Sequence, residues 1–128
     1  MAHQTVTPYL LYENADAAAA FLTRAFGFTE VERTTGAAGG LHLEFETDLG
    51  GRVYAGQPPA GFHNPAEIGR TAIVYVIVES VDEHHDRART AGATVTEELV
   101  DLPIGHRRYS CRDPQGHEWA FAQVLSGA

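Results

Sequence analysis

Cysteine is nearly absent from the sequence: Cys111 is the only one among 128 residues. One thiol excludes an internal disulfide framework and is typical of a reducing compartment, so we expect a cytoplasmic protein. Long apolar runs are also missing, since none reaches the roughly 18 residues of a membrane-spanning helix. The first residues carry neither the basic segment nor the apolar core of a signal peptide. The sequence therefore predicts no association with membranes.

Basic residues are scarce. Lysine and arginine together number 9 against 17 acidic residues, which gives a formal net charge of −8. A field of this sign repels phosphate backbones, so we expect no nucleic-acid partner. Hydrophobic residues make up 44% of the chain and charged residues 20%. These fractions are typical of a globular protein, and the length fits one domain covering residues 1–128.

The chain contains two similar halves. Each half has an apolar strand, a capping residue, a helix and a glycine that can end the helix in a left-handed conformation. In the first half these are 6–12, Asn14, 15–26 and Gly27; in the second they are 71–78, Ser80, 81–91 and Gly92.

Three further strands follow each predicted helix, separated by turns rich in glycine, proline and aspartate. They are 28–34, 41–46 and 52–57 in the first half, and 93–100, 107–112 and 118–124 in the second. We therefore predict an α+β fold of two βαβββ modules, residues 5–57 and 70–125, joined by a linker over 58–69. The modules are expected to form a curved mixed sheet around a cavity.

The strand predicted over 71–78 is apolar on both faces. Such a strand is expected to be buried on both sides, one under its own helix and the other against the second half of the chain or a cavity. Pro8 removes one ladder donor from the first strand, which predicts a free edge there. Both features favour a homodimer, in which a second copy covers the exposed surfaces.

The turn and helix motifs resemble one known family. The stretch Asp113-Pro114-Gln115-Gly116-His117-Glu118-Trp119 is similar to a turn that precedes the last strand in the vicinal oxygen chelate superfamily. The helix ending Phe26-Gly27-Phe28 and the segment 78–92 resemble the two helices of that family. This superfamily contains glyoxalase I, extradiol dioxygenases, and fosfomycin- and bleomycin-resistance proteins. The resemblance covers nearly the whole chain and supports the predicted fold.

The resemblance also implies where a metal would bind. Metal-dependent members hold a divalent ion with His and Glu side chains from strands one, four, five and eight. The corresponding residues here are Thr7, Tyr54, Ile73 and Ala120. None of them is a usual ligand, and a catalytic metal needs about three converging ligands. We therefore predict neither a metal nor another cofactor.

The same positions predict a ligand pocket. Alternation places Ile73 and Tyr75 on one side of their strand, and the offset of about 65 residues between the halves relates Ile73 to Thr7 and Ala120 to Tyr54. A basic cluster precedes the last turn and is interpreted as a polar clamp for an anionic or carbonyl group. Its arginines could instead pair with Asp101 or Asp113. The full predicted ligand set is Thr7, Tyr54, Ile73, Tyr75, Arg107, Arg108, Tyr109 and Ala120.

Most of the remaining histidines and the cysteine are expected to have structural roles. His84 and His85 are expected on a solvated helix face, His117 in local turn contacts, and Cys111 as a half-buried, unreactive thiol. His42 and Glu44 alternate on one strand face, where they could face solvent, line the pocket or hold an ion.

Two functions of different classes remain open. The first is metal-free binding of a small aromatic or anionic molecule in an apolar pocket. The second is catalysis by a lyase, dioxygenase or isomerase with a non-standard active site, for example with Glu44 or His42 as base.

Overall fold

The computed structural model of the chain describes residues 4–35, 40–58, 60–70 and 72–125. Its elements in chain order are β1 (Tyr9–Leu11), α1 (Ala15–Phe26), β2 (Thr29–Thr35), β3 (Leu41–Glu46), β4 (Arg52–Gly56), α2 (Pro65–Ile68), β5 (Ile73–Ile77), α3 (Val81–Thr90), β6 (Thr94–Asp101), β7 (His106–Arg112) and β8 (Glu118–Val124). The bounds of α1, β3 and β8 agree with the sequence prediction. The short helix α2, inside the predicted linker, was not predicted.

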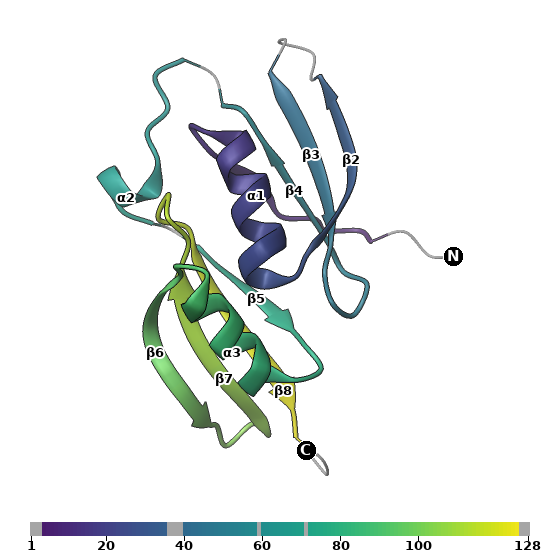
Figure 1. Ribbon diagram of the computed structural model, residues 1–128, viewed down its shortest axis with the longest axis vertical. Helices are drawn as coiled ribbons and strands as arrows, with labels where there is room; N and C mark the ends of the chain where they lie inside the picture. Colours follow the sequence, from purple (N-terminus) through teal and green to yellow (C-terminus); the bar gives the residue numbers. More distant parts are fainter. Residues whose placement is uncertain (1–3, 36–39, 59, 71, 126–128) are drawn as a thin grey trace.

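The strands form two four-stranded mixed sheets with the same topology. The first has the order β1-β4-β3-β2 and the second β5-β8-β7-β6. The pairs β1–β4 and β5–β8 are parallel, and the other pairs are antiparallel. This confirms an α+β fold with two βαβββ modules, which lie one above the other in Figure 1 with α1 and α3 meeting between them. The expectation of one curved sheet is corrected, because the described strands belong to two separate sheets.

Helix α1 begins and ends where its capping residues predict. The side-chain oxygen of Asn14 accepts a hydrogen bond from the Ala17 N–H at 2.9 Å. Gly27 ends the helix with φ of 74°, a conformation that favours glycine. The buried face between these caps is made of small and aromatic side chains: Ala15, Ala18, Ala19, Phe21, Leu22, Ala25 and Phe26. Helix formation and core packing therefore depend on the same stretch of sequence.

Aromatic side chains fill the core between the helices and the second sheet. Trp119 and Phe121 lie on one face of β8 and are fully buried. The ring centroid of Phe26 lies 5.2 Å from that of Trp119 and 4.7 Å from that of Phe121. Trp119 and Phe121 therefore pack beneath a helix. These contacts join α1 of the first module to β8 of the second.

The turn before β8 also connects the modules. Asp113 is buried, and its carboxylate accepts hydrogen bonds from the Tyr12 hydroxyl at 2.6 Å and the Trp119 Nε1–H at 3.1 Å. The Gln115 side chain bonds the backbone of Asn14 as both donor and acceptor. The turn motif that carried the family resemblance thus acts in this chain as a structural link.

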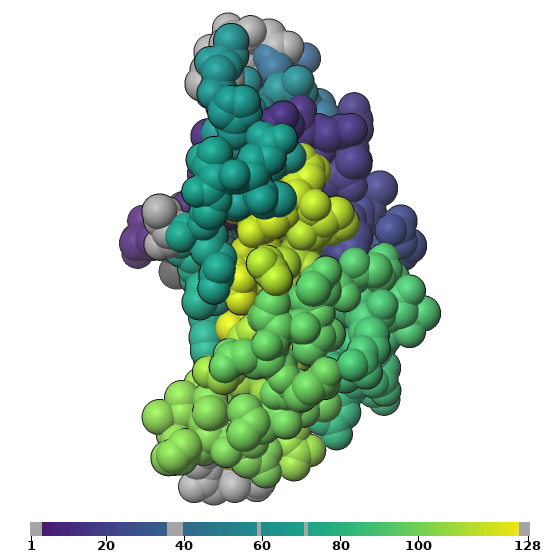
Figure 2. Space-filling view, turned by 90° about the vertical axis from the view of Figure 1, so that its left-hand side faces the viewer, coloured from purple at the N-terminus to yellow at the C-terminus, as the bar shows by residue number. Residues whose placement is uncertain are grey.

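The linker lies against this turn. Figure 2 shows the teal linker running along the surface beside the yellow segment that contains the turn. The Ala66 N–H in α2 donates to the Gln115 carbonyl at 3.1 Å. Gly116 has φ of 98°, and a Cβ at this position would lie 2.6 Å from Ala66 Cα. Glycine is required here by both the backbone conformation and the close approach of α2.

Within the described residues, no helix combines the length and the apolar character needed to span a membrane.

Candidate functional site

Each sheet has one face covered by a helix and one without a helix, which we call its open face. Strand register defines the residues on each open face, because paired residues point to the same side. In the first sheet, Tyr54 pairs with both Tyr9 and Glu44. In the second, Ala120 pairs with both Tyr75 and Ser110.

Strand β5 differs from its sequence prediction. Val76 and Val78 are buried beneath α3, as expected for the covered side. On the open face, Ile73 is 55% exposed and Tyr75 is 44% exposed. The expectation that this strand is buried on both sides is therefore wrong for a single chain, because the described residues leave Ile73 and Tyr75 exposed on the second face. Large exposed apolar side chains on one sheet face are typical of an interaction site.

Four of the predicted ligand residues lie on the open face of the second sheet. Ile73, Tyr75 and Ala120 lie there together, and Arg108 joins them from β7 through its pairing with Ala122. Tyr54 lies on the open face of the first sheet, and Thr7 lies just before β1. The four positions related by the internal repeat are therefore distributed over two sheets of one chain.

Arg107 and Tyr109 lie on the opposite face of β7. Tyr109 pairs with Phe121 and is fully buried against α3, so a ligand on the open face cannot reach it. Arg107 forms ion pairs with Asp101 at 2.7 Å and Asp82 at 3.3 Å. The three residues therefore do not form the single clamp that the sequence predicts, because strand alternation places Arg108 on the opposite face from its two neighbours.

Arg108 is held on the open face with part of its hydrogen-bonding capacity unused. Its Nη2 donates to Glu97 at 3.1 Å, and the Ser110 hydroxyl donates to the same carboxylate oxygen at 3.1 Å. Its Nε is buried and has no hydrogen-bond partner among the described residues. A buried guanidinium N–H without an acceptor has a free-energy cost. The rest of the Arg108 side chain is partly exposed on this face, where a guanidinium can bind an anionic group.

A chain of hydrogen bonds crosses the open face of the first sheet. The Tyr9 hydroxyl lies 2.7 Å from His42 Nδ1, and His42 Nε2 lies 2.9 Å from Glu44 Oε2. The Tyr54 ring packs edge-on against both neighbours, with centroids 6.1 Å from Tyr9 and 5.5 Å from His42. Of the alternatives for His42 and Glu44, the structure shows a half-buried pair on the same face as the predicted ligand residue Tyr54.

Two histidines predicted on a solvated helix face instead pack against other side chains, with His84 half-buried and His85 buried. His84 accepts a hydrogen bond from the Tyr109 hydroxyl at 2.6 Å through Nδ1 and donates to the Phe26 carbonyl at 3.0 Å through Nε2. Burial lowers the pKa of His84 to about 4. His85 is buried and bonded to Glu98 at 2.9 Å. The correction arises because this side of α3 packs on α1 and on the second sheet.

His117 and Cys111 have structural roles. The His117 ring contacts Tyr12 and bonds the Leu11 carbonyl at 2.8 Å, so its contacts extend beyond the local turn that was predicted. Cys111 is fully buried, and burial raises its pKa to about 12. A thiol in this environment is unreactive, although it is more deeply buried than the sequence suggested.

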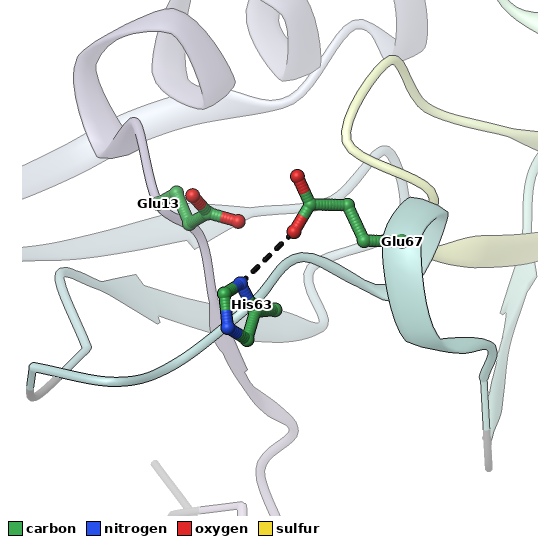
Figure 3. A group of neighbouring side chains, drawn as sticks. All are labelled: Glu13, His63 and Glu67. Atoms are coloured by element: carbon green, nitrogen blue, oxygen red, sulfur yellow. Dashed lines mark hydrogen bonds and ion pairs between the residues drawn. The ribbon is translucent and has the colours of Figure 1, made fainter.

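Only one group in the described ranges brings three potential metal ligands together. Figure 3 shows Glu13, His63 and Glu67 with their ligand atoms within 4.8 Å of one another. All three are exposed, and His63 Nδ1 lies 3.0 Å from Glu67 Oε2. Glu13 lies just before α1, His63 in the linker and Glu67 in α2, and none of them is among the four positions that the resemblance assigned to metal ligands.

Among the described residues, four surface hollows of about 300 to 450 Å³ are large enough for small molecules, and two of them bear on the position of the ligand site. One, of about 300 Å³, lies between the modules and is lined by Pro8, Arg52 and Val53 on one side and by Val74 to Ile77 on the other. The second, of about 370 Å³, lies along α1 and is lined by Tyr12, Phe21 and Gln115 among others. The first hollow borders the open face at Tyr75, whereas the second lies on the helix side of the molecule.

Comparison with known proteins decides the family. A family model described as the Glyoxalase/Bleomycin resistance protein/Dioxygenase superfamily matches residues 3–121. The chain belongs to this superfamily. An uncharacterized protein of Mycobacterium bovis is 30% identical over 94% of the chain and 83% of its own length.

Solved structures of the superfamily show the same fold. TioX from Micromonospora sp. ML1 is 34% identical, with a TM-score of 0.74 over 96% of this chain and all of TioX. The fosfomycin resistance protein FosX of Listeria monocytogenes, in complex with Mn(II) and sulfate, is 15% identical, with a TM-score of 0.68 over 98% of this chain and 94% of its own. The likeness to FosX concerns the fold alone.

Proposed function

We propose that this chain binds a small aromatic, preferably anionic molecule on the open faces of its two sheets, without a metal. The observation that carries the proposal is the exposed pair Ile73 and Tyr75 on the same sheet face as the partly exposed side chain of Arg108. A flat apolar surface on the same face as a guanidinium suits an aromatic ring that carries a carboxylate. Tyr54 and Thr7 extend the proposed surface on the first module. The single buried cysteine favours a cytoplasmic location.

Substitutions on the open face should weaken ligand binding selectively. We expect Tyr75→Ala and Arg108→Ala each to reduce affinity about tenfold, since one aromatic contact or charged hydrogen bond contributes roughly 1 to 2 kcal/mol. Arg107→Ala is the matched control, because the neighbouring arginine lies on the other face of β7. A thermal-shift screen of aromatic carboxylates, followed by calorimetric titration of the hits, measures the affinities. Equal weakening by Arg107→Ala would contradict the proposed site.

We further propose that the active form is a homodimer. The uncovered apolar side of β5 and the free edge of β1 both present surfaces that a second copy can cover. Light scattering at micromolar concentration should give twice the chain mass of 13.9 kDa. Ile73→Glu should shift the protein toward the monomer, whereas Ile68→Glu, at an exposed position on α2, should not. A mass of one chain that persists on concentration would contradict this prediction.

Elemental analysis tests the expectation of a metal-free site. Protein purified without chelators should contain no stoichiometric Zn, Ni, Mn or Fe. The four positions that the resemblance assigns to metal ligands are occupied by residues without an imidazole, thiolate or carboxylate: Thr7, Tyr54, Ile73 and Ala120. His63→Ala is the informative variant, since it removes the imidazole of the exposed cluster in Figure 3. A stoichiometric ion that survives this substitution and is needed for ligand binding would refute the metal-free proposal.

A further inference from the structure

The hollow beside α1, on the helix side of the molecule, has a floor of apolar side chains. Its volume of about 370 Å³ lies within the range of small-molecule pockets. Tyr12, Phe21 and Leu22 are buried residues that line it. Ala17 and Ala18 contribute only methyl groups from α1, which leaves space above the helix. An apolar floor of this kind favours an organic molecule over a simple hydrated ion.

The walls of the hollow come from three segments that are far apart in the sequence. Glu13 and Asn14 precede α1, Asn64 belongs to the linker, and Pro114 and Gln115 lie in the turn before β8. The Glu13 carboxylate accepts the Asn64 N–H at 2.6 Å, and the Gln115 side chain bonds both backbone groups of Asn14. These hydrogen bonds hold the walls in place without a ligand, which lowers the entropic cost of binding one.

The formal charges around the hollow are negative. Glu13 and Asp113 are the charged residues among the described residues that line it. Asp113 is 5% exposed, and the hydrogen bonds its carboxylate accepts in the described part of the chain all come from neutral donors. A buried carboxylate with neutral partners creates a negative potential in the adjoining space, because little water is present to screen it. The hollow therefore attracts a cation.

A second exposed carboxylate strengthens this potential beside Glu13. Figure 3 shows the side chains of Glu13 and Glu67 pointing toward one another, with ligand atoms within 4.8 Å. Two carboxylates this close repel one another, and a cation beside them reduces the repulsion. His63 Nδ1 already bonds Glu67 at 3.0 Å, whereas Glu13 also lines the hollow. Glu13 is therefore the carboxylate best placed to bind a cationic group of a molecule in the hollow.

We propose that this hollow is a second ligand site, for a small organic amine with an apolar body. The apolar part packs on the floor formed by α1 and Tyr12, and the ammonium group binds the Glu13 carboxylate in the negative potential of Asp113. The charge preference is opposite to that proposed for the open faces, so the two sites take different ligands. A molecule in the hollow also contacts both modules and the linker, and it should raise the melting temperature.

Phenethylamine is the probe, because it combines one aromatic ring with a primary ammonium group. Neutral 2-phenylethanol, which has the same size, and the anion phenylacetate are the matched ligands. Titrations followed by amide chemical shifts give both the dissociation constants and the residues affected. Phenethylamine should shift Tyr12, Phe21 and Gln115 most and bind about fivefold more tightly than 2-phenylethanol, the modest gain of an ion pair at an exposed carboxylate. Phenylacetate should leave these three residues unshifted.

Glu13→Gln tests the charge without removing the wall, because the glutamine oxygen can still accept the Asn64 N–H. It should weaken phenethylamine binding about fivefold and leave the affinity for 2-phenylethanol unchanged. Glu32→Gln removes the same charge from an exposed position on β2 and is the matched control. It should leave both affinities unchanged.

Ala17→Leu tests the location by filling the hollow from α1. Leucine is a good helix former, and Ala17 is exposed, so the helix should be retained. Binding of phenethylamine and 2-phenylethanol should each weaken at least about tenfold. Ala20→Leu is the control, since Ala20 is also exposed on α1 and is not among the residues that line the hollow. It should bind both molecules as the wild type does.

The outcomes decide the proposal independently of ligand binding on the open faces. Absence of phenethylamine binding at millimolar concentration, or shifts confined to the open faces, would overturn it. Equal affinities for phenethylamine and 2-phenylethanol would overturn the amine preference. Equal weakening by Glu13→Gln and Glu32→Gln would show a general attraction to an acidic surface and would also overturn it. Shifts around the hollow that weaken in Glu13→Gln and Ala17→Leu and persist in both controls support the site.

Discussion

Replacement of Asp113 by alanine is expected to lower the free energy of unfolding by about 4 kcal/mol, because several buried donors lose their acceptor at once. The carboxylate accepts the Tyr12 O–H and the Trp119 Nε1–H on one oxygen. Its other oxygen accepts the backbone N–H groups of Gln115 and His117 at 3.2 and 3.0 Å. Removing it leaves four donors in a region with little access to water, in a protein whose total stability is on the order of 5–15 kcal/mol.

The measurement is urea unfolding followed by the fluorescence of Trp119, the only tryptophan and a direct partner of Asp113. Asp113→Asn keeps the volume but turns an amide N–H₂ toward donors, and it should cost about 2 kcal/mol. Asp101→Asn, which breaks an exposed ion pair with Arg107, is the control and should leave the unfolding midpoint nearly unchanged, because water screens exposed ion pairs. Equal effects at Asp113 and Asp101 would contradict the structural role of the turn.

Acid is expected to destabilise the protein through His84 by about 3 kcal/mol between neutral pH and pH 4. Burial lowers the pKa of His84 from 6.5 to about 4 in the folded chain, against the raising influence of the Phe26 carbonyl and Asp48, while Arg87 lowers it further. The unfolded state therefore binds a proton first as the pH falls. Stability from this group is complete above pH 6.5, is lost as the pH falls toward 4, and changes no further below that value.

Unfolding free energies at pH 7, 5.5 and 4 in wild type and His84→Gln isolate this contribution. The variant should lose the part of the pH dependence that lies between pH 6.5 and 4, because glutamine does not titrate. His63→Gln, at an exposed histidine beside Glu67, should keep the wild-type dependence. All samples need the same protein concentration, since association would itself change the apparent stability. An unchanged slope in His84→Gln would show that other groups cause the acid sensitivity.

Local signals in the sequence were sufficient for most of the fold. Asn14 and Gly27 mark the two ends of α1, and alternation defines β3 and β8. Helix α2 was not predicted, because its four residues lie in a segment rich in glycine and proline. Pro65 occupies the first turn of this helix. The pairing of strands into two sheets depends on contacts between residues far apart in sequence, and the repeat alone could not distinguish two sheets from one.

The site was only partly predictable for related reasons. The alternation of side chains along a strand places Arg107 and Tyr109 on the face opposite Arg108, whereas the prediction of a polar clamp assigns all three residues to one face. The spacing of Val81, His85 and Ala88 marks the buried face of α3 and would have corrected the solvated interpretation of its histidines. The contact between Tyr9 and His42 had no signal in the sequence. It depends on the register of three strands, which is set by long-range pairing.

Mapping of amide chemical shifts during titration with the tightest-binding aromatic carboxylate from the thermal-shift screen tests most directly whether the open faces are the ligand site. The account predicts the largest shifts at Tyr9, Tyr54 and Tyr75, with small changes along the helices. Shifts concentrated around Tyr12, Phe21 and Gln115, which line the hollow of about 370 Å³ beside α1, would contradict it and place the site on the helix side of the molecule.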